Sequence, residues 1–575
     1  MSTGAALRIG NASGFYGDRL PAWREMLDGG ELDVLTGDYL AELTMLILGR
    51  DRVKDPATGY AKTFLRQLET VLGTAQERGV RLVSNAGGLN PAGLADAIRA
   101  LAARLGLRVA VAHVEGDDVK DRAAELGLGL PLTANAYLGA FGIAECLSAG
   151  ADVVVTGRVT DASLVVGPGI ARFGWTRDDL DALAGATVAG HVLECGAQAT
   201  GGNFAFFTEL PDGARRPGFP LAELHADGSA VITKHPGTGG AVTVETVTAQ
   251  LLYEIGAPAY AGPDVVADFA TIRLAPDGPD RVRIDGVRGA PPPQAVKVGV
   301  NALGGFRNAM TFVLCGLRIE EKAALVRAQL EDALGPEGLE FALARTDRPD
   351  AADEPSASAL LTVHVKDHDP KRAGRTFSQA AVELALASYP GLALTAPPGD
   401  ATPFGVFTGH AIPQGAVDHV AVLPDGTRRH IPPPESGAAS SATSGLTSGP
   451  ASDPDTDVSG FIRQDTIRAP LGVLFGARSG DKGGDANIGV WARTDRAYEW
   501  LRAELTVERL KELLPETGPL RTERHELPNL RAVNFVIHGI LGEGVAASTR
   551  FDPQGKALGE WLRSRVVDLP EELLP

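Results

Sequence analysis

The sequence predicts an α/β protein with an open, mostly parallel, Rossmann-like sheet, a second mixed α/β lobe and a small C-terminal α+β domain. Two observations support this fold class. Short apolar runs alternate with helical patterns over the first two hundred residues, as in parallel sheets that are covered by helices on both faces. A stretch rich in Pro, Ser and Gly then interrupts the chain from residue 432, and strand and helix patterns resume after it.

Five apolar runs in the N-terminal part have the length of buried strands. They lie at residues 7–9, 34–36, 81–84, 109–114 and 152–156. Helical patterns, with apolar residues three and four apart, follow at 39–48, 61–77, 91–105 and 161–172. The alternation predicts a parallel lobe over residues 5–202, within an α/β region that extends to residue 431.

The remaining two thirds of the chain has a less regular pattern. Residues 203–431 are expected to form the mixed lobe, packed on the first. Its expected strands are 231–234, 270–274, 281–285, 311–314 and 360–366, and its expected helices are 243–253, 320–334 and 378–389. Residues 432–461 are poor in apolar side chains, which predicts a flexible linker. Residues 466–572 are expected to form the α+β domain, with strands at 472–477, 488–492 and 530–537 and helices at 497–514 and 556–565.

Composition limits the classes of function. The formal net charge of −18 opposes binding to a polyanion, so we expect no nucleic-acid partner. The three cysteines are far apart in the sequence and form neither a disulfide framework nor a CxxC metal site. We find no signal peptide and no apolar run of membrane-spanning length. We therefore expect a cytoplasmic protein that does not bind membranes, forms a homo-oligomer and acts on a small acyl substrate.

Small and polar residues follow the predicted strands, at the edge where an open parallel sheet holds its ligand. Each turn alone also fits an ordinary helix start, because Asp38, Asn90 and Asp161 all suit an N-cap. Five such turns at one sheet edge favour a shared site. The candidates for substrate binding are Asn11, Ser13, Gly14, Asn85, Gly87, Gly88 and Arg158, and those for acid or base catalysis are Asp38, Asp117 and Asp161.

Two charged groups in these turns allow alternative interpretations. Glu115, Asp117 and Asp118 follow the fourth strand, where neighbouring carboxylates share a proton or bind Mg²⁺. A solvated cluster at a helix start is an equal alternative. Arg158 and Asp161 follow the fifth strand and either hold a substrate carboxylate or pair with each other.

The most distinctive turn is the run 479–489, which lies between two predicted strands of the C-terminal domain. Its glycines permit several backbone amides to point at one anion, as in a nest. Lys482 is one of only eleven lysines in the chain. The alternative is a hairpin turn whose Asp and Gly residues only satisfy turn geometry. We assign Asp481 and Lys482 to catalysis, and we assign substrate binding to Ser479, Gly483, Gly484, Asp485 and Asn487.

A cysteine and a glycine-rich loop form another candidate. If residues 187–195 are helical, His191 and Cys195 lie one turn apart, as a nucleophile and its base would. However, the C-terminal end of a helix raises the pKa of a thiol, so a buried and inert Cys195 is the alternative. The loop that follows is the better candidate for ligand contact, through Thr200, Gly201 and Gly202.

Several familiar signatures of cofactor and metal chemistry are missing from the sequence. There is no GxSxG elbow, no HExxH pair and no Walker motif. Residues 542–547 match a loose G-x-G-x-x-A pattern, but too little chain follows for the second strand of a dinucleotide fold. We therefore expect no NAD and assign no metal ligands, while a divalent cation remains an option.

Several separated motifs occur in order along the N-terminal part of the chain. They are RIGNASGFYGDR from Arg8, LTGDYLAELT from Leu35, SNAGGLNP from Ser84, VTGRVTDA from Val155, ECG from Glu194 and TGGN from Thr200. With these motifs the chain resembles the acyclic terpene utilisation AtuA family over about residues 7–430. The C-terminal part, with 479–489 and Asn534-Phe535, resembles the ferredoxin-like domain that is often fused to this family.

This resemblance implies a fold and a metabolic setting, namely the breakdown of citronellol- and geraniol-type and other branched acids as CoA thioesters. It carries no catalytic mechanism with it. Our leading hypothesis is an enzyme of that catabolism, a lyase or hydro-lyase acting on an acyl-CoA or related carboxylic acid. The alternatives are acyl transfer or thioester hydrolysis through Cys195, and a non-catalytic subunit that binds acyl-CoA.

Overall fold

The computed structural model describes residues 5–434 and 465–574. They divide into two compact units. Unit 1 holds residues 5–301, 407–434, 465–545 and 554–574, and unit 2 holds residues 302–406 and 546–553. Most of the expected linker, 432–461, lies outside the described residues. The compact units do not divide at residue 203, since residues 203–301 and 407–431 of the expected mixed lobe belong to unit 1.

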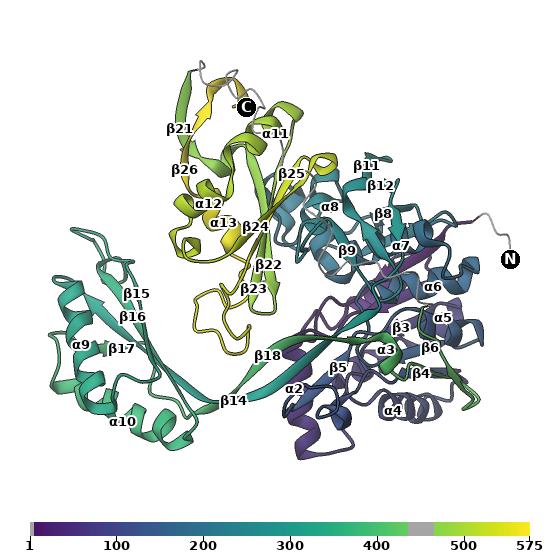
Figure 1. Cartoon of the computed structure of the whole chain (residues 1–575), viewed down its shortest axis with the longest axis horizontal. Helices are drawn as coiled ribbons and strands as arrows, with labels where there is room; N and C mark the ends of the chain where they lie inside the picture. The colour runs from purple at the N-terminus through teal and green to yellow at the C-terminus, as the bar shows by residue number, and fades with distance from the viewer. Residues whose placement is uncertain (1–4, 435–464, 575) are drawn as a thin grey trace. The chain divides into compact units, whose positions relative to one another are not determined.

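Five parallel strands form the centre of the main sheet in unit 1 (Figure 1). They are β1 (Leu7–Asn11), β2 (Val34–Gly37), β3 (Arg81–Ser84), β4 (Val111–Glu115) and β6 (Val153–Thr156). Their order in the sheet is β1-β2-β3-β6-β4, and each neighbouring pair is parallel. All five predicted strands are thus present, and their carboxyl ends lie at one edge of the sheet.

Antiparallel strands extend this sheet on both sides. Beyond β1 lie β7 (Pro220–Leu224), β8 (Ala230–Lys234), β12 (Val282–Asp285) and β11 (Arg273–Pro276), and beyond β4 lie β19 (Val420–Val422) and β20 (Arg428–His430). The sheet has 11 strands, so it is mixed and not mostly parallel. The cause is pairing at the open edges of β1 and β4, by segments that we had placed in a separate lobe.

Helices cover both faces of the sheet. One buried cluster joins apolar residues of α1 (Ala22–Gly29), α3 (Lys62–Arg78) and α4 (Pro91–Arg104) to the strands. A second cluster does the same for α5 (Phe141–Ser148), α6 (Ser163–Phe173) and α7 (Leu180–Glu194). The remaining helices of the N-terminal part are α2 (Glu42–Lys54) and α8 (Val244–Leu251). None of the described helices has the length and apolar character that a membrane span needs.

The helix starts separate the three proposed N-caps. Asn90 caps α4, because its side chain accepts a hydrogen bond from the Gly93 amide. Helix α2 begins after Ala41 and α6 begins after Ala162, so Asp38 and Asp161 are not N-caps. Their carboxylates instead contact other residues at the strand ends.

Between residues 133 and 315, four short strands and one long strand lie outside the main sheet. β5 (Thr133–Ala136), which we did not expect, pairs with the first residues of β14 (Ala295–Cys315). β9 (Ala259–Ala261), β10 (Val266–Asp268) and β13 (Arg288–Ala290) form a small antiparallel sheet. The strand expected at 270–274 begins only at Arg273, because residues 269–271 form a 3₁₀ turn that Asp268 caps.

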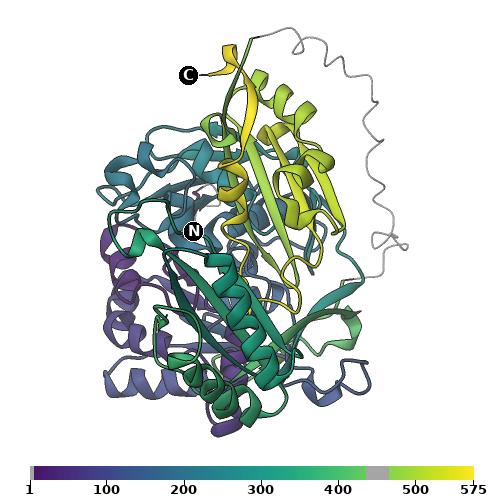
Figure 2. The same ribbon diagram turned by 90° about the vertical axis from the view of Figure 1, so that its left-hand side faces the viewer.

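Unit 2 is built on the second half of β14, together with β15 (Leu339–Ala344), β16 (Ser358–Asp367), β17 (Ala393–Leu394) and the first part of β18 (Thr402–Pro413). Helix α9 (Ile319–Leu334), drawn in teal, runs along this sheet in Figure 2. Helix α10 (Phe377–Glu383) completes the layer and is shorter than the helix expected at 378–389. The two helices and the strands share one apolar core.

The C-terminal domain has a four-stranded antiparallel sheet, and it belongs to unit 1 apart from residues 546–553. The sheet order is β22 (Phe475–Lys482), β23 (Asp485–Ala492), β25 (Ala532–Ile537) and β24 (Thr522–Leu527). The expected helix 497–514 is broken into α11 (Asp495–Glu504) and α12 (Val507–Leu513), and α13 (Leu558–Arg563) follows later. β21 (Thr466–Pro470) pairs with β26 (Val566–Pro570). One apolar core joins these elements.

Candidate functional site

The turns after four parallel strands meet in one network of hydrogen bonds. The Asn85 side chain, after β3, donates to Asp38 Oδ1, after β2, at 2.7 Å. The Arg158 amide, after β6, donates to Asp117 Oδ2, after β4, at 2.8 Å. The Arg158 guanidinium also donates to the Leu40 carbonyl oxygen. The structure therefore brings Asp38, Asn85, Asp117 and Arg158 together, as the parallel topology predicted.

The turn after β1 holds the C-terminal end of α7. Asn11 donates to the carbonyl oxygens of Leu193 and Glu194, the second at 3.2 Å. Gly14 packs so closely on Cys195 that a Cβ at position 14 would lie 2.7 Å from the Cys195 carbonyl carbon. Asn11 and Gly14 thus place the Glu194 and Cys195 segment beside the strand ends.

The end of α7 places the half-buried Cys195 next to the carboxylate of Glu194. Burial raises the pKa of Cys195 well above its usual range, and the charges of Glu194 and Glu254 add to this. The neutral thiol is a poor nucleophile. His191 is fully buried, with Nδ1 3.1 Å from Glu194 Oε1, and burial lowers its pKa to about 4. These shifts favour the inert interpretation of Cys195.

Several carboxyl groups at this place have raised pKa values. Burial raises the pKa of Asp38 well above its usual range, and the charge of Asp161 adds to it. Burial likewise raises the pKa of Glu194, followed by the charges of Asp161 and Glu254. Burial raises the pKa of Asp117 to about 7. Carboxyls of this kind hold or release a proton near neutral pH, as general acids and bases do.

Cationic side chains surround these carboxyls. Arg158 Nη1 lies 3.2 Å from Asp161 Oδ1, and its guanidinium lies 4.2 Å from the centre of the Tyr137 ring. Lys297 Nζ lies 3.5 Å from Glu42 Oε1. Although burial opposes the shift, the charge of Lys297 lowers the pKa of Glu42. Asp161 and Glu42 keep 31% and 22% of their side chains exposed, so the group is open to solvent.

Lys482 reaches the same group from the C-terminal domain. It ends β22, and its Nζ donates to the Glu254 carbonyl oxygen at 3.2 Å. The surrounding protein, and then the charge of Lys297, lower the pKa of Lys482, although the residue keeps contact with solvent. Burial also raises the pKa of Asp481 to about 8. The predicted hairpin therefore completes the group within its own chain.

We call this group the charged cluster. It consists of Asp38, Glu42, Asp117, Arg158, Asp161, His191, Glu194, Glu254, Lys297, Asp481 and Lys482. Sequence reasoning did not select Glu42, Glu254, Lys297 or Glu194 as site residues, although Glu42 and Glu194 lie within motifs that it quoted. No local pattern marks the first three as site residues. Glu42 begins helix α2, Glu254 follows the end of α8, and Lys297 lies in β14 next to its pairing with β5.

Two buried asparagines, one on β23 and one on β25, join the C-terminal domain to the segment that carries Glu254. Asn487 accepts from the Glu254 amide at 2.9 Å and donates to the Leu252 carbonyl oxygen at 2.7 Å. Asn534 donates to the Gly256 carbonyl oxygen at 2.8 Å. Glu254 has a φ of +55°, which costs a non-glycine residue energy and is common at functional sites. Asn487 and Asn534 thus hold a strained residue in place.

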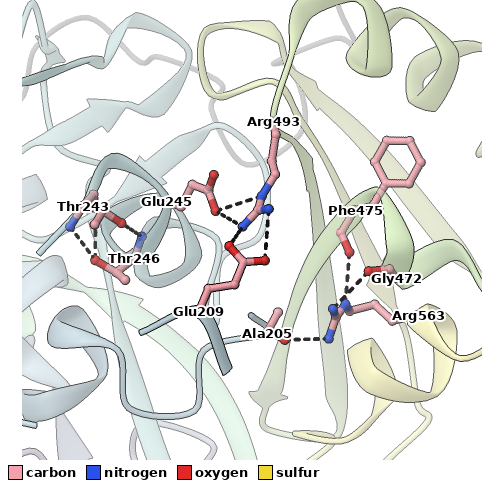
Figure 3. Close-up of polar contacts among 9 residues, drawn as sticks. All are labelled: Ala205, Glu209, Thr243, Glu245, Thr246, Gly472, Phe475, Arg493 and Arg563. Carbon is pink, nitrogen blue, oxygen red and sulfur yellow. Dashed lines mark hydrogen bonds and ion pairs between the residues drawn. The ribbon is translucent and has the colours of Figure 1, made fainter. Parts of the chain in front are cut away.

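Two arginines fasten the same domain nearby (Figure 3). Arg493 binds the carboxylates of Glu209 and Glu245 at distances of 2.6–3.2 Å. Arg563 donates to the carbonyl oxygens of Ala205, Phe475 and Gly472 at 3.0–3.2 Å. Figure 3 also shows the capping box at the start of α8, in which the side chains of Thr243 and Thr246 each accept a hydrogen bond from the other residue's backbone amide. Helix α8 carries Glu245.

Other predicted substrate contacts have their polar groups engaged within the fold. The Thr200 hydroxyl donates to the Gly218 carbonyl oxygen at 2.6 Å. Ser479 Oγ lies 3.0 Å from the Lys556 carbonyl oxygen and accepts from the Gly559 amide. Asp485 accepts from the Gly539 amide and contacts His538. The Ser13 hydroxyl donates to the Phe15 carbonyl oxygen. A substrate-binding role for these four residues stays a prediction.

The predicted glycines occupy tight turns. A Cβ on Gly87 would lie 2.4 Å from the Thr156 carbonyl oxygen, so this glycine permits the ends of β3 and β6 to approach. The others lie in the turn after β3, after the 3₁₀ segment that follows α7, and at the hairpin tip; they are Gly88, Gly201, Gly202, Gly483 and Gly484.

The carboxylates after β4 do not form a shared cation site. Asp117 points to Arg158 and Asn135, whereas Asp118 pairs with Arg52 at 2.8 Å. Glu115 lies 3.5 Å from His113. Across residues 5–434 and 465–574, His, Cys, Asp and Glu side chains form no group of three suited to a metal. These separate partners do not support the Mg²⁺ interpretation of this cluster.

A cavity of about 290 Å³ lies elsewhere in unit 1 and is lined by residues that include Asp181, Arg273 and Asp285. Its charges are paired within the fold, since Arg273 lies 2.7 Å from Asp285 and Asp181 lies 2.6 Å from Arg288. The charged cluster, with its shifted pKa values, is the better candidate for chemistry.

The fold and the charged cluster define an α/β protein whose C-terminal domain contributes Asp481 and Lys482 to a partly buried group of charged side chains. The family model for the acyclic terpene utilisation family protein AtuA matches residues 7–423, and that for the AtuA ferredoxin-like domain matches residues 469–568. The chain therefore belongs to the AtuA family. The family's link to acyclic terpene utilisation supports a catabolic role. Neither the curated proteins nor the solved structures contain a match.

Proposed function

We propose that the protein is a lyase or hydro-lyase of branched or acyclic-terpenoid acid catabolism, acting on an acyl-CoA or a related carboxylic acid. One observation carries the proposal. Side chains from three strand ends, the end of α7 and the C-terminal hairpin meet in the charged cluster, with proton-holding carboxyls beside fixed cations. Adding or removing water next to an acyl carbonyl needs this pair of features, a proton carrier and a positive charge for the developing oxyanion.

The roles follow from exposure. Asp161 is partly exposed and lies beside Arg158, so it is the reachable acid or base. Arg158 and Lys482 hold the anionic oxygen. Asp38 and Glu194 supply protons through their raised pKa values. Asp117 is 2% exposed and bonded to the Arg158 amide, so it positions Arg158.

A panel of enoyl- and hydroxyacyl-CoA thioesters and free branched acids, followed by mass spectrometry, tests the proposal. We expect gain or loss of water with at least one compound. Asp161→Asn and Lys482→Ala should each lower that turnover by about a hundredfold or more, as loss of an acid–base group does. Asp118→Asn, a change in a neighbouring turn whose carboxylate pairs with Arg52, should leave turnover unchanged.

Two outcomes would replace this proposal. Retention of a thioester without any change of mass would indicate a binding subunit that does no chemistry. Labelling of Cys195 by iodoacetamide, with loss of activity, would indicate acyl transfer through the thiol. We expect Cys195 to resist the reagent, because its raised pKa keeps it protonated.

A further inference from the structure

Three arginines of the C-terminal domain face the rest of unit 1, and one of them differs from the others. Arg493 and Arg563 have carboxylate or carbonyl partners on all sides (Figure 3). Arg478 is 8% exposed. It donates through Nη1 to the Asn203 carbonyl oxygen at 2.7 Å, and its guanidinium lies 4.6 Å from the centre of the Tyr253 ring.

The remaining edge of the Arg478 guanidinium is unused. Its Nε and Nη2 are buried and have no hydrogen-bond partner among the residues that the structure describes. No carboxylate of the described chain lies within ion-pair distance of it. A guanidinium keeps its charge in a protein, and a buried charge without a partner is costly. Buried groups left without partners call for an explanation such as an absent ligand.

The position of Arg478 links it to the charged cluster. Glu254 is near enough for its charge to act on Arg478, and the ring of the preceding Tyr253 contacts the guanidinium. Asn203, its only hydrogen-bond partner among the described residues, ends the Thr200–Asn203 loop that the sequence marked for ligand contact. Arg478 therefore lies between that loop and the residue that Lys482 contacts.

We infer that Arg478 binds the carboxylate of a substrate through Nε and Nη2, a role that rests on the proposed function. The two nitrogens form the flat edge of a guanidinium, which matches the two oxygens of a carboxylate with two parallel hydrogen bonds. The ligand-free protein closes over both nitrogens, so the side chains around them must move when a carboxylate enters. A carboxylate held there would direct the rest of the molecule towards Glu254 and Lys482.

Melting temperatures of the full chain test this, with 3-methylbut-2-enoate as the probe. Its primary amide and inorganic phosphate, at matched ionic strength, are the controls. We expect a rise in the melting temperature of the wild-type protein that grows with carboxylate concentration. The amide and phosphate should produce no such rise. In Arg478→Met the apparent affinity should fall roughly tenfold or more, as expected for loss of a paired charged hydrogen bond.

Arg563→Met is the matched control. It breaks a fully bonded arginine of the same domain, so it should lower the melting temperature without ligand but keep the carboxylate effect. Arg478→Met should leave the ligand-free melting temperature unchanged or raised, because it removes an uncompensated charge.

The inference is overturned if Arg478→Met keeps the wild-type response to the carboxylate, or if the wild-type protein responds equally to phosphate or the amide. A lower ligand-free melting temperature in Arg478→Met, with no carboxylate effect in the wild type, would show a structural arginine only. These failures are distinct from that of the proposed function. If the carboxylate effect depends on Arg478 but no thioester or acid is turned over, the binding site at Arg478 is supported and the proposed reaction is contradicted.

Discussion

The two units of the molecule bury very different side chains. The core of unit 2 consists of apolar residues such as Phe312 and Val326, and its buried Lys322 donates to the Cys315 carbonyl oxygen. Unit 1 buries Asp38, Asp117 and other charged groups beside its apolar cores. Apolar packing accounts for the side chains buried in unit 2. Burying charged side chains costs free energy, so packing does not account for the charged cluster, and we expect the chemistry in unit 1.

The largest expected effect is on packing in unit 2. Phe312 is 0% exposed, so Phe312→Ala should destabilise this unit by about 3–5 kcal/mol through a cavity. Hydrogen exchange should become faster in β14–β16 and stay unchanged in β1–β3. Leu325→Ala, on α9 at a residue 41% exposed, is the control and should have little effect. Equal loss of protection in both units would contradict their separation.

The next effect concerns the buried carboxyl of Asp117. Its pKa of about 7 lies above the ordinary 3.8, so the folded chain keeps a proton that the unfolded chain releases between these values. Its contribution to the free energy of unfolding is therefore complete below about pH 4. It falls by up to about 1.4 kcal/mol for each pH unit up to about 7.

Calorimetry between pH 5 and 8 checks this contribution. Relative to Asp117→Asn, the wild-type protein should lose melting temperature as the pH rises to 7, and Asp118→Asn should follow the wild type. Parallel curves for all three proteins would show that Asp117 is ionised throughout and carries no raised pKa.

An effect of comparable size is expected where the C-terminal domain joins the charged cluster. Asn487→Ala would leave the Glu254 amide and the Leu252 carbonyl oxygen without their partner, at a cost of about 1–3 kcal/mol for each buried group. Limited proteolysis should then cut the segment around Glu254 faster. Wild-type resistance to proteolysis in this variant would mean that Asn487 does not hold Glu254.

The smallest effect is expected at the exposed ion pairs. Arg493 is 35% exposed in its side chain, so Arg493→Ala should cost less than about 1 kcal/mol, as exposed salt bridges do. Added salt should weaken the wild-type domain contact slightly and leave the variant unaffected. If Arg493→Ala loses as much resistance to limited proteolysis as Asn487→Ala, the expected difference between the two contacts is contradicted.

Much of the site near the parallel strands could be predicted from sequence. Asp38 and Asn85 are far apart in the chain, yet the rule that parallel strands end at one edge brought them together correctly. The same rule says nothing of residues outside that edge. Glu254 owes its place to Asn487, and Lys297 owes its place to the pairing of β14 with β5. Such long-range pairings leave no local signal in the sequence.

The errors in the fold have a related cause. The strand at 231–234 was predicted well, but its hairpin partner β7 was not expected, and its other partner, β12, is fixed by a long-range pairing. Only 311–314 of β14 was expected, because Gly304, Gly305 and Asn308 interrupt its apolar pattern. The boundaries of unit 2 fall within β14 and β18, where no turn or linker marks them.

A crystal structure of the protein with a bound branched acyl ligand tests the central claim most directly. The account predicts a ligand within hydrogen-bond distance of Arg158 or Lys482, next to Asp161, with strand-end turns and the C-terminal hairpin of one chain around it. A ligand bound instead in the cavity beside Asp181, or within unit 2, with the charged cluster empty, would contradict the account.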